Sequence, residues 1–402
     1  MANSLLTIDM ITREALRVLE NELVLTRTVN RQYDDRFARE GAKIGDTLRI
    51  RKPDRVLVTD GAVLTAQAVN QQYTNLTVST QKHIGLDFTT AEMTMNLDNF
   101  SDLVLKPRVS QLAASIDADL ANAFKYIGNS VGTPGTTPAT SQVILSANQK
   151  LNELAAPMGQ RYACVNPAAN ASLVEGMKGL FNPVGAISKQ FKNGMMGEGI
   201  LGLDEFNMSQ SIASFTTGSR TGTILVNGAV TTEGATTITI DGAGASNTIK
   251  LGDVFTVADC YAVNPQTRQS TGSLFQFVAL SDVTLNGSGE GDITVAAMYS
   301  SSHALATVNT LPQNNKALTF MGGVSTAYPQ NLIYHKDSIT FATADLVLPK
   351  GNGTASRAQH NGISMRLVKD WYDAVNDRMV TRLDVLYGWA VLRPETAVRL
   401  WG

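Results

Sequence analysis

The sequence has few of the residues on which catalytic and metal sites usually depend. Among 402 residues there are only two cysteines and four histidines. Cys164 and Cys260 lie far apart and form no CxxC pattern, so we expect both to be small buried hydrophobic residues in a reducing compartment. The histidines are His83, His303, His335 and His360. None is at metal-ligand spacing from another ligand residue, so we expect no metal, no cofactor and no catalytic site.

Long apolar runs and charged residues are also scarce. No stretch approaches the roughly 18 apolar residues of a membrane span, and residues 1–14 show no signal-peptide pattern. We therefore expect a protein made in the cytoplasm without membrane association and, because the chain begins at Met1, without a removed propeptide. The net charge of −2 argues against a dedicated nucleic-acid binder. Charged residues make up only 17%, and a lightly charged surface favours contacts with other proteins.

One glycine-rich segment matches a nucleotide-binding fingerprint in form. Gly197–Gly202 fits GxGxxG. That fingerprint binds phosphate only where it follows a strand and opens a helix. Here it follows a predicted helix near residues 184–193 and enters a predicted strand, so we expect a turn instead. No GxSxG, HExxH or GxxxxGK[ST] motif is present, and an enzyme is therefore the least favoured class.

Two segments show strong helical periodicity. Residues 7–26 form an amphipathic helix in which Leu16 and Leu19 belong to the apolar face. This face has no obvious partner within the chain, so we expect it to pack on a neighbouring subunit or on the second helix. The second stripe consists of Leu105, Val109, Leu112, Ile116, Leu120, Ala123 and Ile127. It predicts one long helix that has Pro107 in its first turn and ends at Gly128.

Residues 43–90 are predicted to form a long β-hairpin. The strands are polar on one face and carry few apolar residues on the other, so the hairpin needs an external surface to lie on. Its densest basic cluster is Arg49, Arg51, Lys52 and Arg55. Acidic residues interleave with this cluster, and no aromatic side chain is available for base stacking. The pattern favours an ion pair with a neighbouring subunit over DNA binding.

The composition changes at about residue 215. Residues 215–325 are rich in Thr, Gly, Ser and Val, and short alternating runs recur between turn residues. This predicts a self-contained antiparallel barrel or sandwich. A helix at 142–155, a strand at 162–165 and a helix opened by Asn166-Pro167 precede it. Strands at 331–348 and a hairpin at 363–392 follow, so the β-module interrupts an α+β domain.

This order of elements resembles the Hong Kong 97-type capsid fold, and three segments are similar to coat proteins of the short-tailed Salmonella phage group. Residues 387–395 (YGWAVLRPE) resemble that family's Tyr-Gly-x-x-x-x-Arg-Pro-Glu ending. Residues 165–167 (VNP) resemble its strand-to-helix junction, and residues 199–204 (GILGLD) its Gly-x-x-Gly-Phe-Asp turn, with Leu203 in place of the aromatic residue.

The resemblance implies an α+β fold with six segments. They are an N-terminal helical arm (1–40), an extended β-hairpin or E-loop (41–90), the spine helix and peripheral domain (91–141), the first part of the axial domain (142–214), an inserted β-barrel-like domain (215–325), and the second part of the axial domain with returning peripheral strands (326–402). It also implies that a loop of the inserted domain bridges capsomers, for which we select residues 264–273 with Arg268.

The function implied is that of a major capsid protein of a tailed double-stranded-DNA bacteriophage. Hexamers and pentamers of the chain would form an icosahedral shell through a scaffold-assisted procapsid that expands on DNA packaging. The implied partners are other copies of the chain, a scaffolding protein, a portal protein and, through weak non-specific contacts, the packaged DNA. Two alternatives remain, which are an encapsulin-type nanocompartment and a tail or adhesin-like β-protein.

Overall fold

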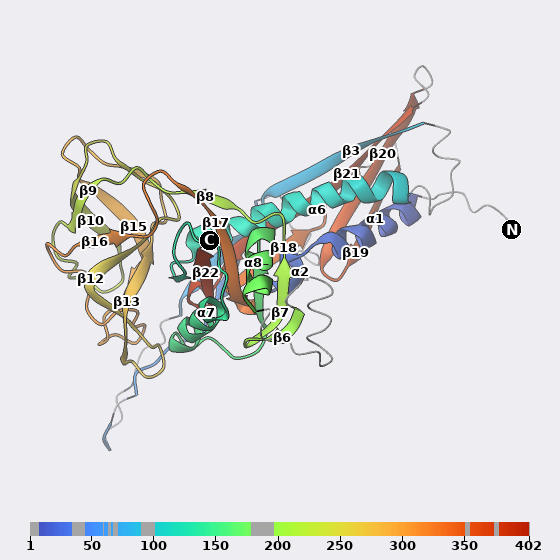
Figure 1. Ribbon diagram of the computed structural model, residues 1–402. Helices are drawn as coiled ribbons and strands as arrows, with labels where there is room; N and C mark the ends of the chain where they lie inside the picture. The colour runs from blue at the N-terminus through green and yellow to red at the C-terminus, as the bar shows by residue number, and fades with distance from the viewer. Residues whose placement is uncertain are drawn as a thin grey trace. The chain divides into compact units, whose positions relative to one another are not determined.

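The computed structural model describes residues 8–33, 45–58, 60–62, 66, 71–89, 101–177, 197–349, 354–373 and 378–401. The helix expected near residues 184–193 lies outside this part of the chain. The fold is mixed α+β (Figure 1). The backbone forms two compact units. The first comprises residues 1–50, 73–120 and 339–392, and the second comprises residues 51–72, 121–338 and 393–402.

The first unit is built on a five-stranded antiparallel sheet centred on β21 (Arg378–Val391) (Figure 1). Its other strands are β3 (Thr80–Thr89), β18 (Ile339–Ala344), β19 (Thr354–His360) and β20 (Ile363–Asp373). β21 pairs with β3, β18 and β20, and β19 pairs with β20. The predicted hairpin at 363–392 is therefore confirmed. Both faces of β21 are buried along residues 383–388.

Asp384 occupies the centre of this sheet as a fully buried carboxylate. Its oxygens accept hydrogen bonds from Arg366 Nη2 at 2.6 Å, Arg382 Nε at 2.6 Å and Gln81 Nε2 at 3.2 Å. Burial would raise the pKa of the Asp384 carboxyl, but the hydrogen bonds from the two guanidinium groups outweigh it and hold the pKa below its usual value. The carboxylate therefore stays charged and cross-links neighbouring strands.

The long apolar stripe lies on a helix shorter than expected. The α-helix α6 spans Lys106–Ala121, follows a π-helical turn at Ser101–Leu105 and passes into a 3₁₀ turn at Asn122–Tyr126. All seven residues of the stripe are buried, as predicted. Gly128 does not end the helix. Instead, a Cβ at Gly128 would lie 2.5 Å from the carbonyl oxygen of Gln276, so this position requires glycine because two backbones approach closely.

Polar contacts fasten α6 to the sheet of the first unit. Lys82 Nζ on β3 lies 2.6 Å from Asp119 and 2.9 Å from the carbonyl oxygen of Ser115, both on α6. The buried Tyr387 hydroxyl donates a hydrogen bond to the same Asp119. Burial, together with Asp119, raises the pKa of Tyr387, which therefore remains a hydrogen-bond donor.

The N-terminal helix α1 (Ile8–Glu22) corrects one expectation. The helix lies against β19 and β20 of the same unit (Figure 1), and Leu16 and Leu19 on its apolar face are 2% and 0% exposed. The expectation that this face lacks a partner within the chain is therefore wrong. Leu16 and Leu19 are core residues of the subunit, and we no longer assign them to an inter-subunit contact.

The segment after α1 is fixed by a second buried carboxylate. Asp117 on α6 accepts hydrogen bonds from the amides of Val24 (2.7 Å), Leu25 (3.3 Å) and Thr26 (3.0 Å). These residues open the short helix α2 (Leu25–Thr28). Burial raises the pKa of Asp117, although the hydrogen bonds oppose this shift. Asn30 then joins the edge of β18, where its amide donates to the carbonyl oxygen of Ile339 at 3.1 Å.

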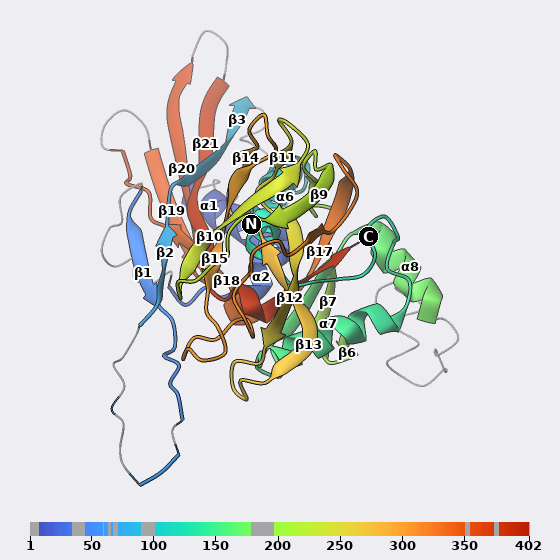
Figure 2. The same ribbon diagram turned by 90° about the vertical axis from the view of Figure 1, so that its left-hand side faces the viewer.

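The hairpin of residues 43–90 is shorter than predicted. Only β1 (Thr47–Arg51) and β2 (Tyr73–Thr77) form the two-stranded ribbon seen in Figure 2. β3 does not continue this ribbon and pairs with β21 along its whole length. Ile50, Leu76 and Val78 at the base of the ribbon are buried in a cluster with β18 and β21. The ribbon is thus anchored in its own subunit.

The second unit contains a mixed sheet with the order β4-β22-β17-β5-β7-β6, in which β8 also pairs with β17. The strands are β4 (Ser130–Val131), β5 (Arg161–Val165), β6 (Gly197–Ile200), β7 (Leu203–Met208), β8 (Ser214–Thr216), β17 (Ala327–His335) and β22 (Ala397–Trp401). β6 and β7 form a hairpin, so the GxGxxG segment contains the predicted turn at residues 201 and 202, but its first four residues form strand β6.

Two helices of the second unit, α7 (Ser141–Glu153) and α8 (Pro167–Met177), share an apolar cluster with this sheet. α8 begins as the Asn-Pro pair predicts. The Oδ1 of Asn166 accepts a hydrogen bond from the amide of Ala169 at 2.8 Å, and Pro167 is the first helical residue. The predicted strand at 162–165 corresponds to β5.

The inserted module of residues 215–325 is β-rich, as predicted, but its strands form three separate ladders. The strands are β9 (Gly222–Val226), β10 (Ala235–Ala243), β11 (Thr248–Ile249), β12 (Val254–Val263), β13 (Ser270–Val278), β14 (Val283–Thr284), β15 (Gly291–Met298) and β16 (Leu318–Phe320). The ladders are β15-β10-β9, β11-β14 and β13-β12-β16. They do not close, so the expected barrel is not confirmed.

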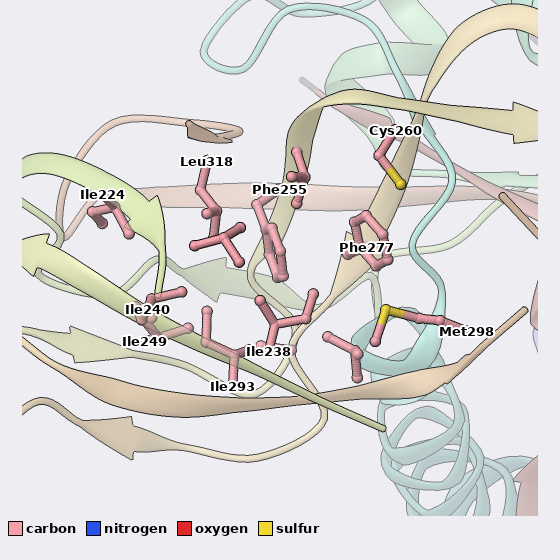
Figure 3. Packing of buried hydrophobic residues seen from close by; sticks show 14 of the residues in the cluster. Ile224, Ile238, Ile240, Ile249, Phe255, Cys260, Phe277, Ile293, Met298 and Leu318 are labelled. Atoms are coloured by element: carbon pink, nitrogen blue, oxygen red, sulfur yellow. The ribbon is translucent and has the colours of Figure 1, made fainter. Parts of the chain in front are cut away.

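The module has its own hydrophobic core (Figure 3). Phe255 and Phe277 stack with their ring centroids 5.5 Å apart, and Ile238 and Ile293 are buried in the same cluster. Each large apolar side chain buried in this way contributes about 1.5–3 kcal/mol. The core thus arises from the alternating runs read in the sequence.

A buried ion pair closes the base of the module, where the chain enters and leaves it. Asp253 is fully buried and accepts hydrogen bonds from Arg220 and from the amides of Gly218 and Lys250. Arg220 also donates to the carbonyl oxygen of Met321 at 2.8 Å, on the segment that leaves the module. The pair therefore links the first and last segments of the insertion.

Candidate inter-subunit surface

The predicted basic cluster divides into residues with different roles. Arg49 lies over the ring of Tyr73, with the guanidinium carbon 3.2 Å from the ring centroid. The expectation that no aromatic side chain is available in the hairpin is therefore wrong, because Tyr73 on β2 faces Arg49 on β1. This cation–π contact holds Arg49 flat on the ribbon, while Arg51 is exposed to solvent.

Arg55 already has an acidic partner within its own unit. Its Nη2 lies 3.2 Å from Glu395 Oε1, and Arg393 Nε lies 3.8 Å from the same oxygen. Burial lowers the pKa of the nearby Lys52 ammonium; the attraction of Glu395 opposes this, while the positive charges of Arg55 and Arg393 add to it. The cluster thus has more positive than negative charge, and its exposed members are Arg49, which lies on Tyr73, and Arg51.

Apolar side chains in the segment after β1 are exposed. Val56 is 65% and Val58 is 91% exposed, and neither belongs to a strand. The sequence pattern suggested that both would lie in the hairpin strand. Because apolar surface is costly to leave in water, their exposure adds an apolar component to the candidate surface. The signal for it in the sequence is the run Val56-Leu57-Val58 after Pro53.

Arg268 lies in a turn that is fixed within the module. Its backbone is left-handed (φ 62°), and its Nη2 donates to the carbonyl oxygens of Ser301 and His303. Asn264, at the start of the turn, donates from Nδ2 to the carbonyl oxygen of Glu153 at the end of α7 (2.7 Å). The guanidinium of Arg268 therefore supports a neighbouring loop, and a role in bridging capsomers stays a prediction.

Gln276 and Lys150 connect the module to the mixed sheet. The side-chain amide of Gln276 accepts from the Ser130 amide at 2.7 Å and donates to the Ser130 carbonyl oxygen at 3.1 Å, as a paired strand would. Lys150 Nζ also donates to Gln276 Oε1. Burial lowers the pKa of Lys150 to about 8, although Glu153 partly opposes the shift.

We expect Lys150→Met to stabilise the subunit at pH 7, because Gln276 keeps both bonds to Ser130 and a buried charge is removed. In the unfolded chain the lysine ammonium has a pKa of about 10.4. Between about pH 8 and pH 10 the unfolded state therefore binds more protons, and wild-type stability should rise with pH.

Thermal melting of the unassembled subunit at several pH values checks this prediction. The variant should melt at a higher temperature than the wild type at pH 7. Its melting temperature should not show the increase toward pH 10 that we expect for the wild type. Lys106→Met is the matched control, since Lys106 is 49% exposed. If the variant instead melts at a lower temperature than the wild type at pH 7, the hydrogen bonds of the ammonium outweigh the cost of burying its charge.

The described residues contain no group of three or more His, Cys, Asp or Glu side chains that could hold a metal ion. In that same part of the chain, no helix has both the length and the apolar character needed to cross a membrane. The feature with a possible function is instead the hairpin surface, which is anchored in the core at its base and exposes Arg51, Val56 and Val58.

Comparison with known protein families gives a match over the whole chain. The family model described as "P22 coat protein - gene protein 5" matches residues 1–402. The chain belongs to the P22 coat protein family. It is a major capsid protein of a tailed double-stranded-DNA phage, with the Hong Kong 97-type fold, and it is a component of the virion. The family match favours this function over the encapsulin and tail-protein alternatives.

Solved structures similar to this coat protein include phage capsids. The structure titled "Mycobacterium phage Che8" is 12% identical, covers 94% of this chain and 90% of its own, and has a TM-score of 0.43. A virus-like particle from Pyrococcus furiosus is 9% identical, covers 97% of both chains and has a TM-score of 0.38. The CUS-3 coat protein I-domain is 19% identical and covers 26% of this chain and 98% of its own, with a TM-score of 0.20. No match was found among the curated proteins.

Two residues of the family-like segment 387–395 have structural roles in this coat protein. Glu395 of the Arg-Pro-Glu ending is the acidic partner of Arg55. Gly388 of the Tyr-Gly pair lets β21 approach the chain at Thr77, because a Cβ there would lie 2.1 Å from the Thr77 carbonyl oxygen. Both residues thus support the chain between residues 47 and 78.

Proposed function

We propose that this coat protein forms hexamers and pentamers of an icosahedral head that encloses double-stranded DNA, and that the hairpin and the segment after it contact an adjacent subunit. The observation that carries the proposal is the contrast along this part of the chain. Ile50, Leu76 and Val78 are buried in their own subunit, whereas Val56 and Val58 expose most of their apolar surface. A second subunit that covers these valines would remove that surface from water.

Charge supports the same contact. Glu395 is shared between Arg55 and Arg393, so the exposed Arg51 is available to an acidic side chain from another copy. One exposed ion pair contributes at most about 1 kcal/mol. In a closed shell the same pair recurs at every equivalent interface, so small contributions add up over the assembly.

Assembly in host cytoplasm would involve further partners. A scaffolding protein would guide formation of a procapsid, a portal protein would occupy one vertex, and packaged DNA would touch the shell through weak non-specific contacts. Expansion on packaging would be a rigid-body and hinge transition between two shell states. The family membership supports these partners, and the low net charge of −2 is compatible with weak contacts to DNA.

Expression of the chain by itself tests the proposal. We expect large closed or aberrant shells or polymers, detected by sedimentation velocity and electron microscopy. The physical reason is that another copy of the chain would cover the exposed apolar segment and remove it from water. A subunit that stays monomeric at high concentration, both with and without the scaffolding protein, would contradict the proposal.

Single substitutions then separate the charged from the apolar contribution. We expect Arg51→Glu to lower shell yield or shell thermal stability moderately, and Val58→Asp to lower shell yield more, because the aspartate must lose its hydration at the interface. Neither should change the melting temperature of the unassembled subunit by more than a degree or two, since both residues are exposed.

Lys250→Glu is the charge-matched control for Arg51→Glu, because Lys250 is exposed on the inserted module. If Arg51→Glu assembles with the yield and stability of the wild type, the basic patch is merely solvated. The contact would then depend on Val56, Val58 and the backbone. If Val58→Asp also assembles normally, this segment is not at an interface.

A further inference from the structure

Arg399 on β22 is a fully buried arginine with an incomplete set of partners. Its side chain has no exposed surface, and its Nη1 donates to the carbonyl oxygen of Gly252 at 2.8 Å. Among the described residues, neither Nε nor Nη2 of Arg399 has a hydrogen-bond partner. Buried polar groups are almost always hydrogen-bonded, and buried charges are normally paired. Two free donors on a charged, buried group therefore require a further partner.

The two free donors of Arg399 form one edge of its guanidinium group. The N–H bonds of Nε and Nη2 lie in one plane and point in the same direction, as in the forks with which arginine holds carboxylates and phosphates. Nη1, which donates to Gly252, lies on the other side of the group. We call the free edge the Arg399 fork. Its two N–H groups are directed at one place, where a single anion would accept from both.

The buried charges near the Arg399 fork do not balance. Arg399 and Arg220 are both buried, and the buried carboxylate of Asp253 is paired with Arg220. In the described part of the chain, no carboxylate forms an ion pair with Arg399. Asp253 acts on it only from a distance, because burial lowers the pKa of Arg399 to about 9 and Asp253 opposes this shift. Arg399 therefore stays charged at neutral pH, and two buried cations share one buried carboxylate.

Two other buried polar atoms on the same strand pair differ from the fork, because they complement each other. Within the described residues, Trp401 on β22 has a free Nε1–H, and Gln330, its partner in the β17–β22 register, has a free Oε1. One water molecule between a donor and an acceptor satisfies both. Arg399 presents two donors instead, and Leu332, opposite it on β17, has no side-chain acceptor. A negatively charged acceptor completes the fork and also balances the charge, whereas water only completes the fork.

From this geometry we propose that the Arg399 fork binds a small inorganic anion of the size of chloride. The complete burial of Arg399 favours a small ion over a phosphate group or a peptide carboxylate. The ion would lie where the mixed sheet meets the inserted module, because the same guanidinium donates to Gly252, next to Asp253. It would thus stabilise the attachment of the module to the sheet. The site belongs to the subunit itself and does not require a shell.

The dependence of stability on chloride tests the site. The unassembled full chain is unfolded in urea while chloride replaces gluconate, which is too large for a buried site, at constant sodium concentration. The ionic strength and the screening of surface charges then stay the same. For one bound ion, each tenfold rise in chloride above its dissociation constant should raise the folding equilibrium constant about tenfold. Equal stability of the wild type in the two salts would overturn the proposal.

Two variants assign the chloride dependence to the fork. Arg399→Met removes both donors and the charge, and it should abolish the dependence. Arg399→Lys keeps the charge without the planar fork, so the same stabilisation should require about tenfold more chloride. Arg13→Met is the control, because Arg13 is an exposed arginine on α1, and it should keep the wild-type dependence. If Arg399→Met keeps that dependence as well, chloride acts elsewhere and the proposal is wrong.

A direct measurement on the wild type decides the matter if the variants do not fold. Crystals of the unassembled subunit in sodium bromide locate bound bromide, a substitute for chloride, by its anomalous scattering. We expect a peak within hydrogen-bond reach of both Nε and Nη2 of Arg399. A water molecule at the fork without an anomalous signal would overturn the proposal. Bromide at the fork of a protein that is equally stable in chloride and gluconate would be an adventitious ion only, which also overturns it.

Discussion

Replacement of Asp253 by alanine is expected to lower the free energy of unfolding of the coat protein subunit by roughly 3–5 kcal/mol, because it leaves a buried charge without its partner. Arg220, with a side chain only 4% exposed, loses its acidic partner, and the Gly218 amide loses its acceptor. Burial lowers the pKa of Arg399 to about 9 and Asp253 opposes that shift, so a second buried guanidinium is affected.

Urea unfolding of the unassembled subunit measures this loss. Asp259→Asn is the matched control, because the Asp259 side chain is 64% exposed, pairs with Lys316 at 2.6 Å, and has a left-handed backbone (φ 63°) that asparagine also tolerates. We expect the control to cost less than about 1 kcal/mol. Equal losses from the two variants would mean that water reaches Asp253 and Arg220, and that the base of the inserted module is open in solution.

The second large effect is expected from Gly388→Ala. A Cβ at this position would lie 2.1 Å from the Thr77 carbonyl oxygen and 2.8 Å from Val78 Cα. Both contacts are with backbone, so β2 and β21 would have to separate. Overpacking of this kind costs about 1–3 kcal/mol and occasionally more. The base of the hairpin would loosen as the strands part, because Leu76 and Val78 belong to the buried cluster there.

Gly85→Ala is the control in the same sheet, because a Cβ at Gly85 would meet nothing within 4 Å. We expect it to match or slightly exceed wild-type stability, since alanine restricts the unfolded chain more than glycine does. Thermal melting gives the stability of both variants, and limited proteolysis within residues 51–72 reports on the hairpin. If Gly388→Ala melts at the same temperature as the wild type, β2 does not lie against β21.

Elements defined by local spacing were predictable. The apolar stripe from Leu105 to Ile127 is buried throughout because helical periodicity places these side chains on one face. Asn166 caps α8 because its side chain needs only the amide three residues on. The alternating runs of the module became strands for the same reason, since alternation is a property of a few adjacent residues.

The candidate surface was only partly predictable. The basic cluster could be seen in the sequence, but the different contacts of its members could not. Arg55 is neutralised by Glu395, 340 residues away in the chain, and no spacing rule links two such positions. Arg49 stacks on Tyr73 because the hairpin brings the two residues face to face. The exposure of Val58 could not be predicted either, because an apolar run in extended chain normally indicates a paired strand.

The sequence by itself determined which residues are apolar, the start of α8 at its Asn-Pro pair, and, through three short motifs, the capsid family. Each of these depends on residues within a few positions of one another. The tertiary structure decided which surfaces are already covered. Leu16 and Leu19 are buried by β19 and β20, which lie more than 330 residues later, and β3 pairs with β21 instead of extending the hairpin. Burial depends on what the whole chain brings against a residue, and that information is non-local.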